Sequence, residues 1–236
     1  MPVRRNNVAA RCSFLEAPNY VPSEAAWALN VPRSTLHDWI SPKAHRSSRG
    51  PAQRPPLVTP AGRDQRGPML SFMNLVELHI LRAFRRANVS MPNIRRAVDW
   101  LREYEKGERH PLVRNDLHTF GDGVFIEKLG EIIEISCSGQ RAIHEAVAEH
   151  LQRVEWEDKT VPRRIFPLSA GPGASFEINP NVAYGQLVLR GTRIPVEPIL
   201  DRFDAGESIG SLAYDYGQET KTIEATIYSF RPRVAA

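Results

Sequence analysis

The residues with the clearest capacity for chemistry in this chain begin a short helical pattern, RSTLHDWI, at residues 33–40. Arg33, Ser34, Thr35 and His37 would face outward near its N-terminus, where free N–H groups and the helix dipole favour phosphate. Arginine can also reach a guanine edge in the major groove, and a hydroxyl can bond a base or a phosphate. Asp38 is discordant, because a carboxylate repels phosphate unless it faces a cytosine amino group. These residues predict a DNA recognition helix, and the alternative is a helical hairpin that only caps a core.

The elements needed to position such a helix are found in residues 22–40, PSEAAWALNVPRSTLHDWI. A helix-turn-helix needs small or apolar residues where two short helices touch, and a turn residue that tolerates left-handed backbone. Asn30 suits the turn, and Pro32 suits the opening of the second helix. The inward positions are Ala25, Ala26 and Leu29 in the first helix, and Val31, Leu36 and Trp39 in the second. The spacing therefore predicts a helix-turn-helix.

A stretch rich in Pro, Gly, Ser and Arg follows at residues 41–68 and predicts a loop, with a brief strand at 57–59. Its cations are interpreted as a wing against the DNA backbone, which adds affinity without sequence choice. They are Lys43, Arg46, Arg49 and Arg54. Residues 60–68 are interpreted as a solvated, disordered linker.

Two longer helices are predicted after Ser71. Apolar residues recur at three- and four-residue steps from Phe72 to Phe84, and Ile94, Val98 and Leu101 continue the pattern in a helix beginning at Ser90. The junction FRRANVSMPNIRRA, together with YVPSEAAWALNVPRSTLHDW upstream, resembles a MerR-like winged-helix domain over residues 20–105. The resemblance implies a DNA-binding fold.

Charge divides the chain into a basic front and an acidic back. Residues 1–106 hold 17 Lys and Arg against 8 Asp and Glu (+9), and residues 107–236 hold 14 against 19 (−5), which gives the net +4. A basic half suggests a polyanion partner, although chance variation between two solvated surfaces is the alternative. Two distant cysteines, Cys12 and Cys137, favour a reducing cytosol. Neither a secretory signal nor a membrane-length apolar run is recognised, so no membrane partner is expected.

The middle of the chain predicts a small antiparallel β meander at 117–136, from the runs LHTF, VFIEKL and IIEIS. An amphipathic helix is expected at 139–154, with Ile143, Val147, Leu151 and Val154 on one stripe. His144 and His150 lack the four-residue spacing that places two histidines on one metal, and they are interpreted as surface residues. Neither a metal nor a cofactor is expected.

Near the end of the chain, LVLRGTRIPVEPIL at residues 187–200 predicts a strand that turns into a helix. Gly191 permits the left-handed turn, and Pro198 suits the first turn of the helix. Three helices are expected at 197–205, 209–214 and 220–230, with Gly206, Ser208 and Thr220 at their ends. Arg193 is expected either to pair with a nearby carboxylate such as Asp201 or to reach a partner.

Residues 176–230 resemble a small domain of VapB-type antitoxins, whose members carry a G-T-R-I-P-V step followed by short helices around a Gly-polar-Ser step. The resemblance implies a partner, a VapC-type PIN-like ribonuclease toxin from an adjacent gene. Such nucleases hold divalent metal with clustered carboxylates, so an antitoxin can offer arginine to that site or simply block RNA entry. Arg193, Arg231 and Arg233 are the candidates here, and the alternative for the tail RPRVAA is a frayed end.

The sequence thus predicts a mainly α, α+β chain in three parts. These are a MerR-like winged helix-turn-helix domain at 12–106, a β meander with an amphipathic helix at 107–170, and a three-helix, helix-turn-helix-like antitoxin domain at 171–236. The expected function is a cytoplasmic type II antitoxin that binds operator DNA and a toxin, as a homodimer because one short helix reads little sequence. The alternative is a MerR-like regulator that responds to a small effector. No enzyme is expected, since no Gly-rich phosphate loop, nucleophile elbow or metal spacing is recognised.

Overall fold

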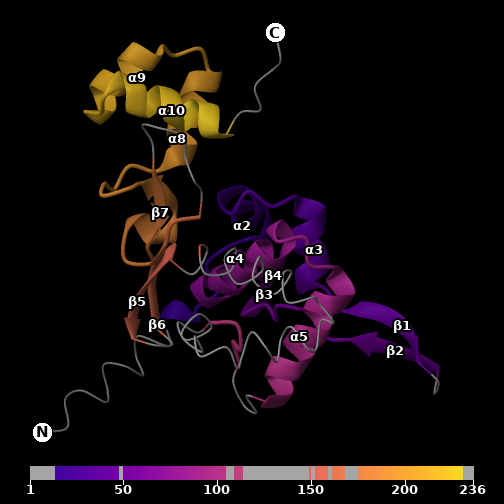
Figure 1. Ribbon diagram of the computed structural model, residues 1–236. Helices are drawn as coiled ribbons and strands as arrows, with labels where there is room; N and C mark the ends of the chain where they lie inside the picture. The colour runs from indigo at the N-terminus through magenta and orange to yellow at the C-terminus, as the bar shows by residue number, and fades with distance from the viewer. Residues whose placement is uncertain are drawn as a thin grey trace, which may run out of the picture. The chain divides into compact units, whose positions relative to one another are not determined.

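The chain has an α+β fold that divides into two compact units, Met1–Arg163 and Arg164–Ala236 (Figure 1). In this computed structural model the described residues are 14–47, 50–104, 109–113, 149, 152–158, 161–167 and 175–230. Within these ranges, no helix is long and apolar enough to cross a membrane.

The predicted helix-turn-helix is confirmed in the N-terminal unit. Helix α2 (Pro22–Ala28) is followed by α3 (Arg33–Ile40), and Asn30 between them has a left-handed φ of 48°. Ala25 and Ala26 are only 1% exposed, and their small side chains let the two short helices approach closely. Pro32 is the N-cap of α3 rather than its first helical residue.

The predictions of a loop at residues 41–68 and of a solvated, disordered linker at 60–68 are wrong where two hairpins form. Strands β1 (Lys43–Ser47) and β2 (Gly50–Arg54) pair antiparallel, and so do β3 (Gly62–Asp64) and β4 (Gly67–Met69). The second hairpin is closed by Asp64, whose Oδ1 accepts from the backbone N–H groups of Arg66 and Gly67 at 2.8 and 3.0 Å. Residues 57–59 form no strand; Leu57 and Val58 are buried core residues, and the Val58 N–H donates to the carbonyl of Trp39 at 3.1 Å.

The two longer helices are confirmed as α4 (Phe72–Arg86) and α5 (Met91–Tyr104). Ser71 caps α4: its Oγ accepts from Asn74 N–H at 3.2 Å, and Asn74 Oδ1 accepts from Ser71 N–H at 3.1 Å. Asn88, with a left-handed φ of 60°, turns the chain between the helices. The predicted inward positions of α5, Ile94, Val98 and Leu101, are all buried.

A small sheet has the strand order β5-β6-β7-β8, and the division between the two units falls inside β6. Its strands are β5 (Val154–Asp158), β6 (Val161–Ile165), β7 (Phe176–Ile178) and β8 (Leu187–Leu189). The assignment of Val154 to a helix is wrong, because residues 152–153 form a turn and Val154 begins β5. The predicted meander at 117–136 lies outside the described residues, as do residues 139–148 and 150–151 of the predicted helix, which include His144 and His150.

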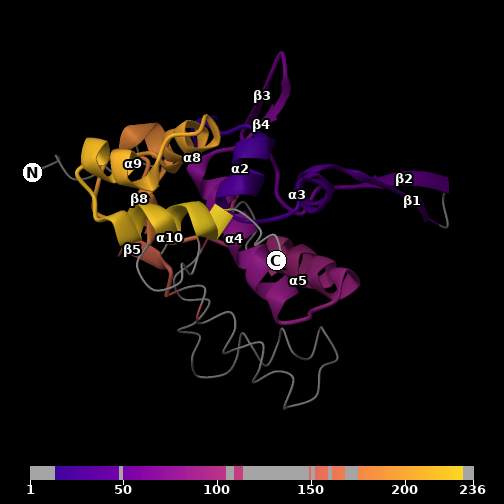
Figure 2. The ribbon, with the colours of Figure 1, turned by 90° about the horizontal axis from the view of Figure 1, so that it is seen from above.

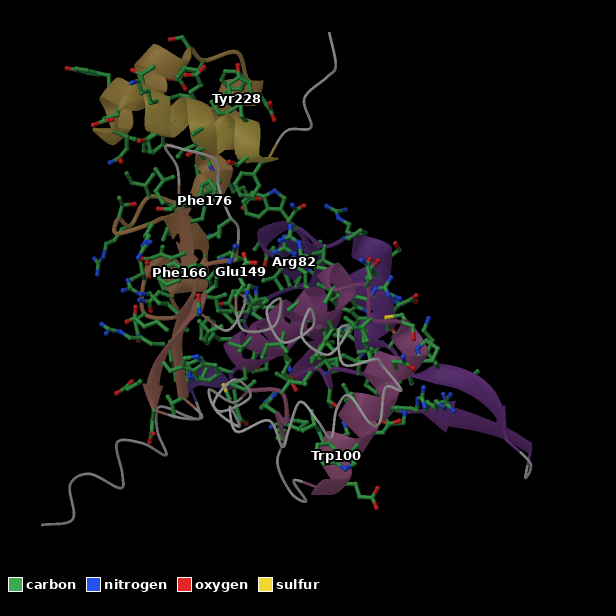
Figure 3. The ribbon with its side chains drawn as sticks, viewed as in Figure 1. Arg82, Trp100, Glu149, Phe166, Phe176 and Tyr228 are labelled. Carbon is green, nitrogen blue, oxygen red and sulfur yellow. The ribbon has the colours of Figure 1, made fainter. Side chains whose placement is uncertain are left out.

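The three C-terminal helices are confirmed as α8 (Val196–Asp204), α9 (Ile209–Tyr216) and α10 (Thr220–Phe230). Gly206 ends α8 with a left-handed φ of 96°, and Ser208 Oγ caps α9 by accepting from Ser211 N–H at 3.1 Å. Thr220 is the first residue of α10 rather than its cap. Phe176 of β7 packs edge-on against Phe230 of α10, with ring centroids 5.1 Å apart, where the strands of this unit meet its helices (Figure 3).

Candidate nucleic-acid interface and the C-terminal elbow

Helix α3 has one face anchored in the core and one face open to solvent. Leu36 and Trp39 are 0% and 2% exposed, so the helix is fixed from behind by large apolar side chains. On the other face Arg33, Ser34 and His37 are exposed, while Thr35 is half-buried. Arg33 makes no ion pair with any residue that the structure describes. The outward arginine is therefore available to a ligand.

The β1–β2 hairpin extends from the end of α3, as Figure 2 shows. Lys43 lies opposite Arg54 in its first register position, and Arg46 lies on β1 opposite Pro51. Lys43 and Arg54 thus lie side by side at the base of the hairpin, and Lys43 is close in sequence to the open face of α3. Arg49 lies outside the described residues.

Asp38 on α3 pairs with Lys43, the first residue of β1, through a hydrogen bond from Nζ to Oδ1. This hydrogen bond lowers the pKa of the Asp38 carboxyl, and the charges of Lys43, His37 and Arg95 lower it further. The discordant carboxylate of the sequence is thus neutralised by a neighbouring element. The electrostatic influence of Arg95, from α5, was missed by sequence reasoning, because only the fold brings residues so far apart in sequence near each other.

The G-T-R-I-P step forms an elbow between β8 and α8, and Thr192 is its main structural side chain. Thr192 Oγ1 donates to the carbonyl of Leu189 at 2.8 Å and accepts from Ile194 N–H at 3.1 Å. Gly191 has the left-handed φ of 74° that was predicted for it. The elbow is therefore held by hydrogen bonds between Thr192 Oγ1 and its own backbone, together with the left-handed backbone of Gly191.

Arg193 is exposed at this elbow. The considered pairing with Asp201 is not formed, since no ion pair joins the two described side chains. The other two candidate arginines, Arg231 and Arg233, lie outside the described residues.

Glu177 of β7 contacts the elbow through the backbone N–H of Gly191. This residue was not identified from the sequence. Its carboxylate is buried, and it accepts from Arg164 Nη1 at 3.0 Å and from Gly191 N–H at 3.4 Å. The signal in the sequence is a lone acid inside an otherwise apolar strand, FEI, which in a folded protein requires a partner.

Arg202 joins the helices of the C-terminal unit. Its guanidinium donates to Glu207 at 2.6 and 2.5 Å and to Asp215 at 2.5 Å, and it lies 5.2 Å from the ring centre of Tyr216. The Arg202 hydrogen bonds lower the pKa of Glu207. Across the described residues, no group of three or more His, Cys, Asp or Glu side chains could hold a metal ion.

Two protein-family models match this chain, one in each of its two units. Residues 18–98 match a family model described as a putative DNA-binding HTH domain, and residues 177–228 match a protein family of unknown function, DUF433. The crystal structure of Rv2018 from Mycobacterium tuberculosis is similar, with a TM-score of 0.67 at 26% identity, over 89% of this chain and 98% of that chain.

A curated relative extends the likeness over most of the sequence. The chain is 33% identical over 219 residues to the putative antitoxin VapB45 of Mycobacterium tuberculosis (strain ATCC 25618 / H37Rv). The alignment spans 86% of this chain and 89% of the relative. The chain therefore belongs to the family of the putative antitoxin VapB45.

Proposed function

We propose that this chain is a type II antitoxin that represses its own operator and neutralises a VapC-type, PIN-like ribonuclease toxin encoded by a neighbouring gene. DNA binding is assigned to a domain at 12–106 of MerR-like winged-helix type, and toxin binding to residues 171–236. The observation that carries the DNA-binding half is the open face of α3, where Arg33, Ser34 and His37 are exposed above a buried anchor.

The placement of Arg33 suits recognition of DNA. It is the first residue of α3, at the helix end where free N–H groups favour phosphate. From there a guanidinium can reach either a phosphate or the O6 and N7 atoms of guanine. Lys43, Arg46 and Arg49 are the proposed contacts to the DNA backbone, which by themselves carry no sequence information.

One eight-residue recognition helix contacts only a few base pairs, so the chain would act as a homodimer on two half-sites about one helical turn apart. Light scattering of the chain at micromolar concentration, with and without operator DNA, tests this assembly. A monomer under both conditions would contradict it.

The toxin-binding half is supported by the name of the aligned relative and by the charge of the C-terminal helices. Residues 196–230 hold seven Asp and Glu against two Lys and Arg, a balance poorly suited to nucleic acid. This favours a protein partner for the C-terminal part. Arg193, Arg231 and Arg233 are the proposed contacts to the carboxylates of the nuclease.

The DNA-binding half is tested with Arg33→Ala, using duplex DNA from the region upstream of the gene. Loss of one base-contacting arginine should weaken specific binding by about 1–3 kcal/mol. The matched control is Lys221→Ala, which removes an exposed cation from the start of α10, and it should leave binding unchanged. Unchanged operator binding by folded Arg33→Ala would overturn the recognition-helix assignment.

The toxin-binding half is tested by coexpression of the full chain with the product of the neighbouring gene. Copurification, restored growth and suppressed RNA cleavage are the expected results. Arg193→Ala, and separately the double variant Arg231→Ala with Arg233→Ala, should weaken the complex if these side chains reach the nuclease. If the full chain neither binds the neighbour nor restores growth, the antitoxin function fails and a regulator that responds to a small effector becomes the better account.

A further inference from the structure

The carboxylate of Asp38 opposes the proposed binding of DNA through α3. It is the only acidic residue of the helix, it is exposed, and it lies one position after His37 on the open face. A carboxylate there subtracts from attraction to phosphate, which supplies nearly all of the affinity for DNA of arbitrary sequence. Its cost to binding calls for a physical reason.

The geometry shows what the carboxylate does in the free protein. Asp38 Oδ1 accepts the hydrogen bond from Lys43 Nζ, and the side chains remain 59% and 42% exposed. The pair joins the end of the recognition helix to the first residue of the hairpin, and Arg95 of α5 contributes a further positive charge nearby. In the free protein, Lys43 Nζ is therefore bound to a carboxylate of the same chain.

An exposed ion pair of this kind contributes little to stability and readily exchanges partners. On DNA of arbitrary sequence, the neutral Lys43–Asp38 pair gains little attraction to phosphates. If the pair breaks there, the unpaired carboxylate of Asp38 is repelled by them. On a site with a cytosine beneath Asp38, the cytosine N4 amino group donates to the carboxylate, and Lys43 is released to a phosphate. The exchange is favourable only where the right base is present.

We infer that Asp38 is a specificity-determining residue, which holds Lys43 away from the DNA backbone and so restrains binding to DNA of arbitrary sequence. The inference rests on the proposed DNA-binding function and names one of its devices. It requires Asp38 to act through Lys43 rather than through the net charge of the chain.

The test measures binding of the full chain to a random-sequence duplex and to the duplex upstream of its gene, across a series of salt concentrations. Asp38→Asn frees Lys43, so affinity for the random duplex should rise about three- to tenfold at low salt. The slope of log K against log[salt] should steepen by about one, because one further phosphate is neutralised. Affinity for the upstream duplex should gain less or fall, so the ratio between the two affinities decreases. Asp38→Ser repeats the loss of charge with another neutral side chain.

Two controls separate the mechanism from a general change of charge. Glu103→Gln removes an exposed carboxylate from the far end of α5 and should leave the salt slope unchanged. In a Lys43→Ala background, Asp38→Asn still removes a repulsive carboxylate, but no cation is released to a phosphate. It should therefore raise affinity for the random duplex less than in the unaltered chain and leave the salt slope unchanged.

Each contrary result has a distinct meaning. Failure of the unaltered chain to bind either duplex overturns the proposed DNA-binding function, and the inference with it. If the unaltered chain binds, and Asp38→Asn leaves the random-duplex affinity and slope unchanged, the inference alone is overturned. The same rise in the Lys43→Ala background, or with Glu103→Gln, also overturns it.

Discussion

The pair α2–α3 in the N-terminal unit and the pair α9–α10 in the C-terminal unit are built alike. Each joins two short helices through a left-handed residue, Asn30 at φ 48° and Gly217 at φ 59°. Each second helix is anchored by buried side chains, such as Leu36 in α3 and Ile223 in α10. What differs is how the charged side chains of each unit are paired.

The ion pairs of the two units are arranged in opposite ways. In the N-terminal pair a cation, Lys43, neutralises the single acid of α3 and leaves Arg33 exposed. In the C-terminal unit two acids, Glu207 and Asp215, bind the single arginine of α8. The helical hairpin is thus a packing solution that both units share. Under the proposed function, the charged side chains around it would distinguish a surface for nucleic acid from one for another partner.

The largest expected effect tests the anchor of each second helix. Trp39→Ala, at a side chain 2% exposed, should lower the free energy of unfolding by about 3–5 kcal/mol, and Ile223→Ala, at 0%, by about 2–5 kcal/mol. Denaturant unfolding measures both. Because the two residues belong to different units, amide exchange should speed up around α2–α3 for the first and around α8–α10 for the second. Identical exchange patterns would show that the two units do not unfold separately.

Glu177→Gln is the next largest test, directed at the elbow that has no counterpart in the N-terminal pair. The substitution leaves Arg164 without its carboxylate, although the Arg164 side chain is 28% exposed and keeps access to water. We expect a loss of about 1–3 kcal/mol in the free energy of unfolding. Arg163→Ala is the control, since its partner Glu155 lies in an exposed pair and the loss should stay below about 1 kcal/mol. An equal loss from both variants would contradict the role of Glu177.

The helices of both units could be predicted from sequence because their signals are local. Apolar spacing located α4, and Asn30 and Gly206 marked the turns where left-handed backbone was required. The hairpins β1–β2 and β3–β4 could not, because KAHRS, GPAQR, GRD and GPM carry no apolar alternation. Their pairing depends on turns and on neighbouring elements. The contact between Glu177 and Arg164 is also invisible in sequence, since strand register alone brings residues 13 apart together.

Asn30 and Gly217, the left-handed residues between the paired helices, test the comparison through smaller changes in stability. A Cβ at Gly217 would meet nothing within 4 Å, so Gly217→Ala should cost only the left-handed backbone penalty, about 1–2 kcal/mol. Asn30→Ala should cost less, about 0.5–1 kcal/mol, because asparagine already bears part of that penalty. Thermal unfolding measures both variants, with Asn30→Gly as a control of nearly unchanged stability. A larger loss at Asn30 than at Gly217 would mean that the asparagine side chain does more than permit the turn.

The smallest effect concerns the two carboxylates that define the opposite charge arrangements, Asp38 and Glu207. Hydrogen bonds from Lys43 and Arg202, respectively, lower their pKa values below the ordinary range. A lowered folded-state pKa gives stability that is present above the unfolded pKa and is lost as pH falls through the folded pKa. Asp38 is exposed and Glu207 is only half-buried, so solvent screening keeps this loss small, and the titration itself is the better measurement. Carboxyl-carbon NMR should place both midpoints below those of unpaired Asp and Glu. Lys43→Ala should return only the Asp38 midpoint toward its ordinary value, and Arg202→Ala only that of Glu207. If either variant moves both midpoints, or neither, the two charge arrangements are not the separate local pairs that distinguish the units.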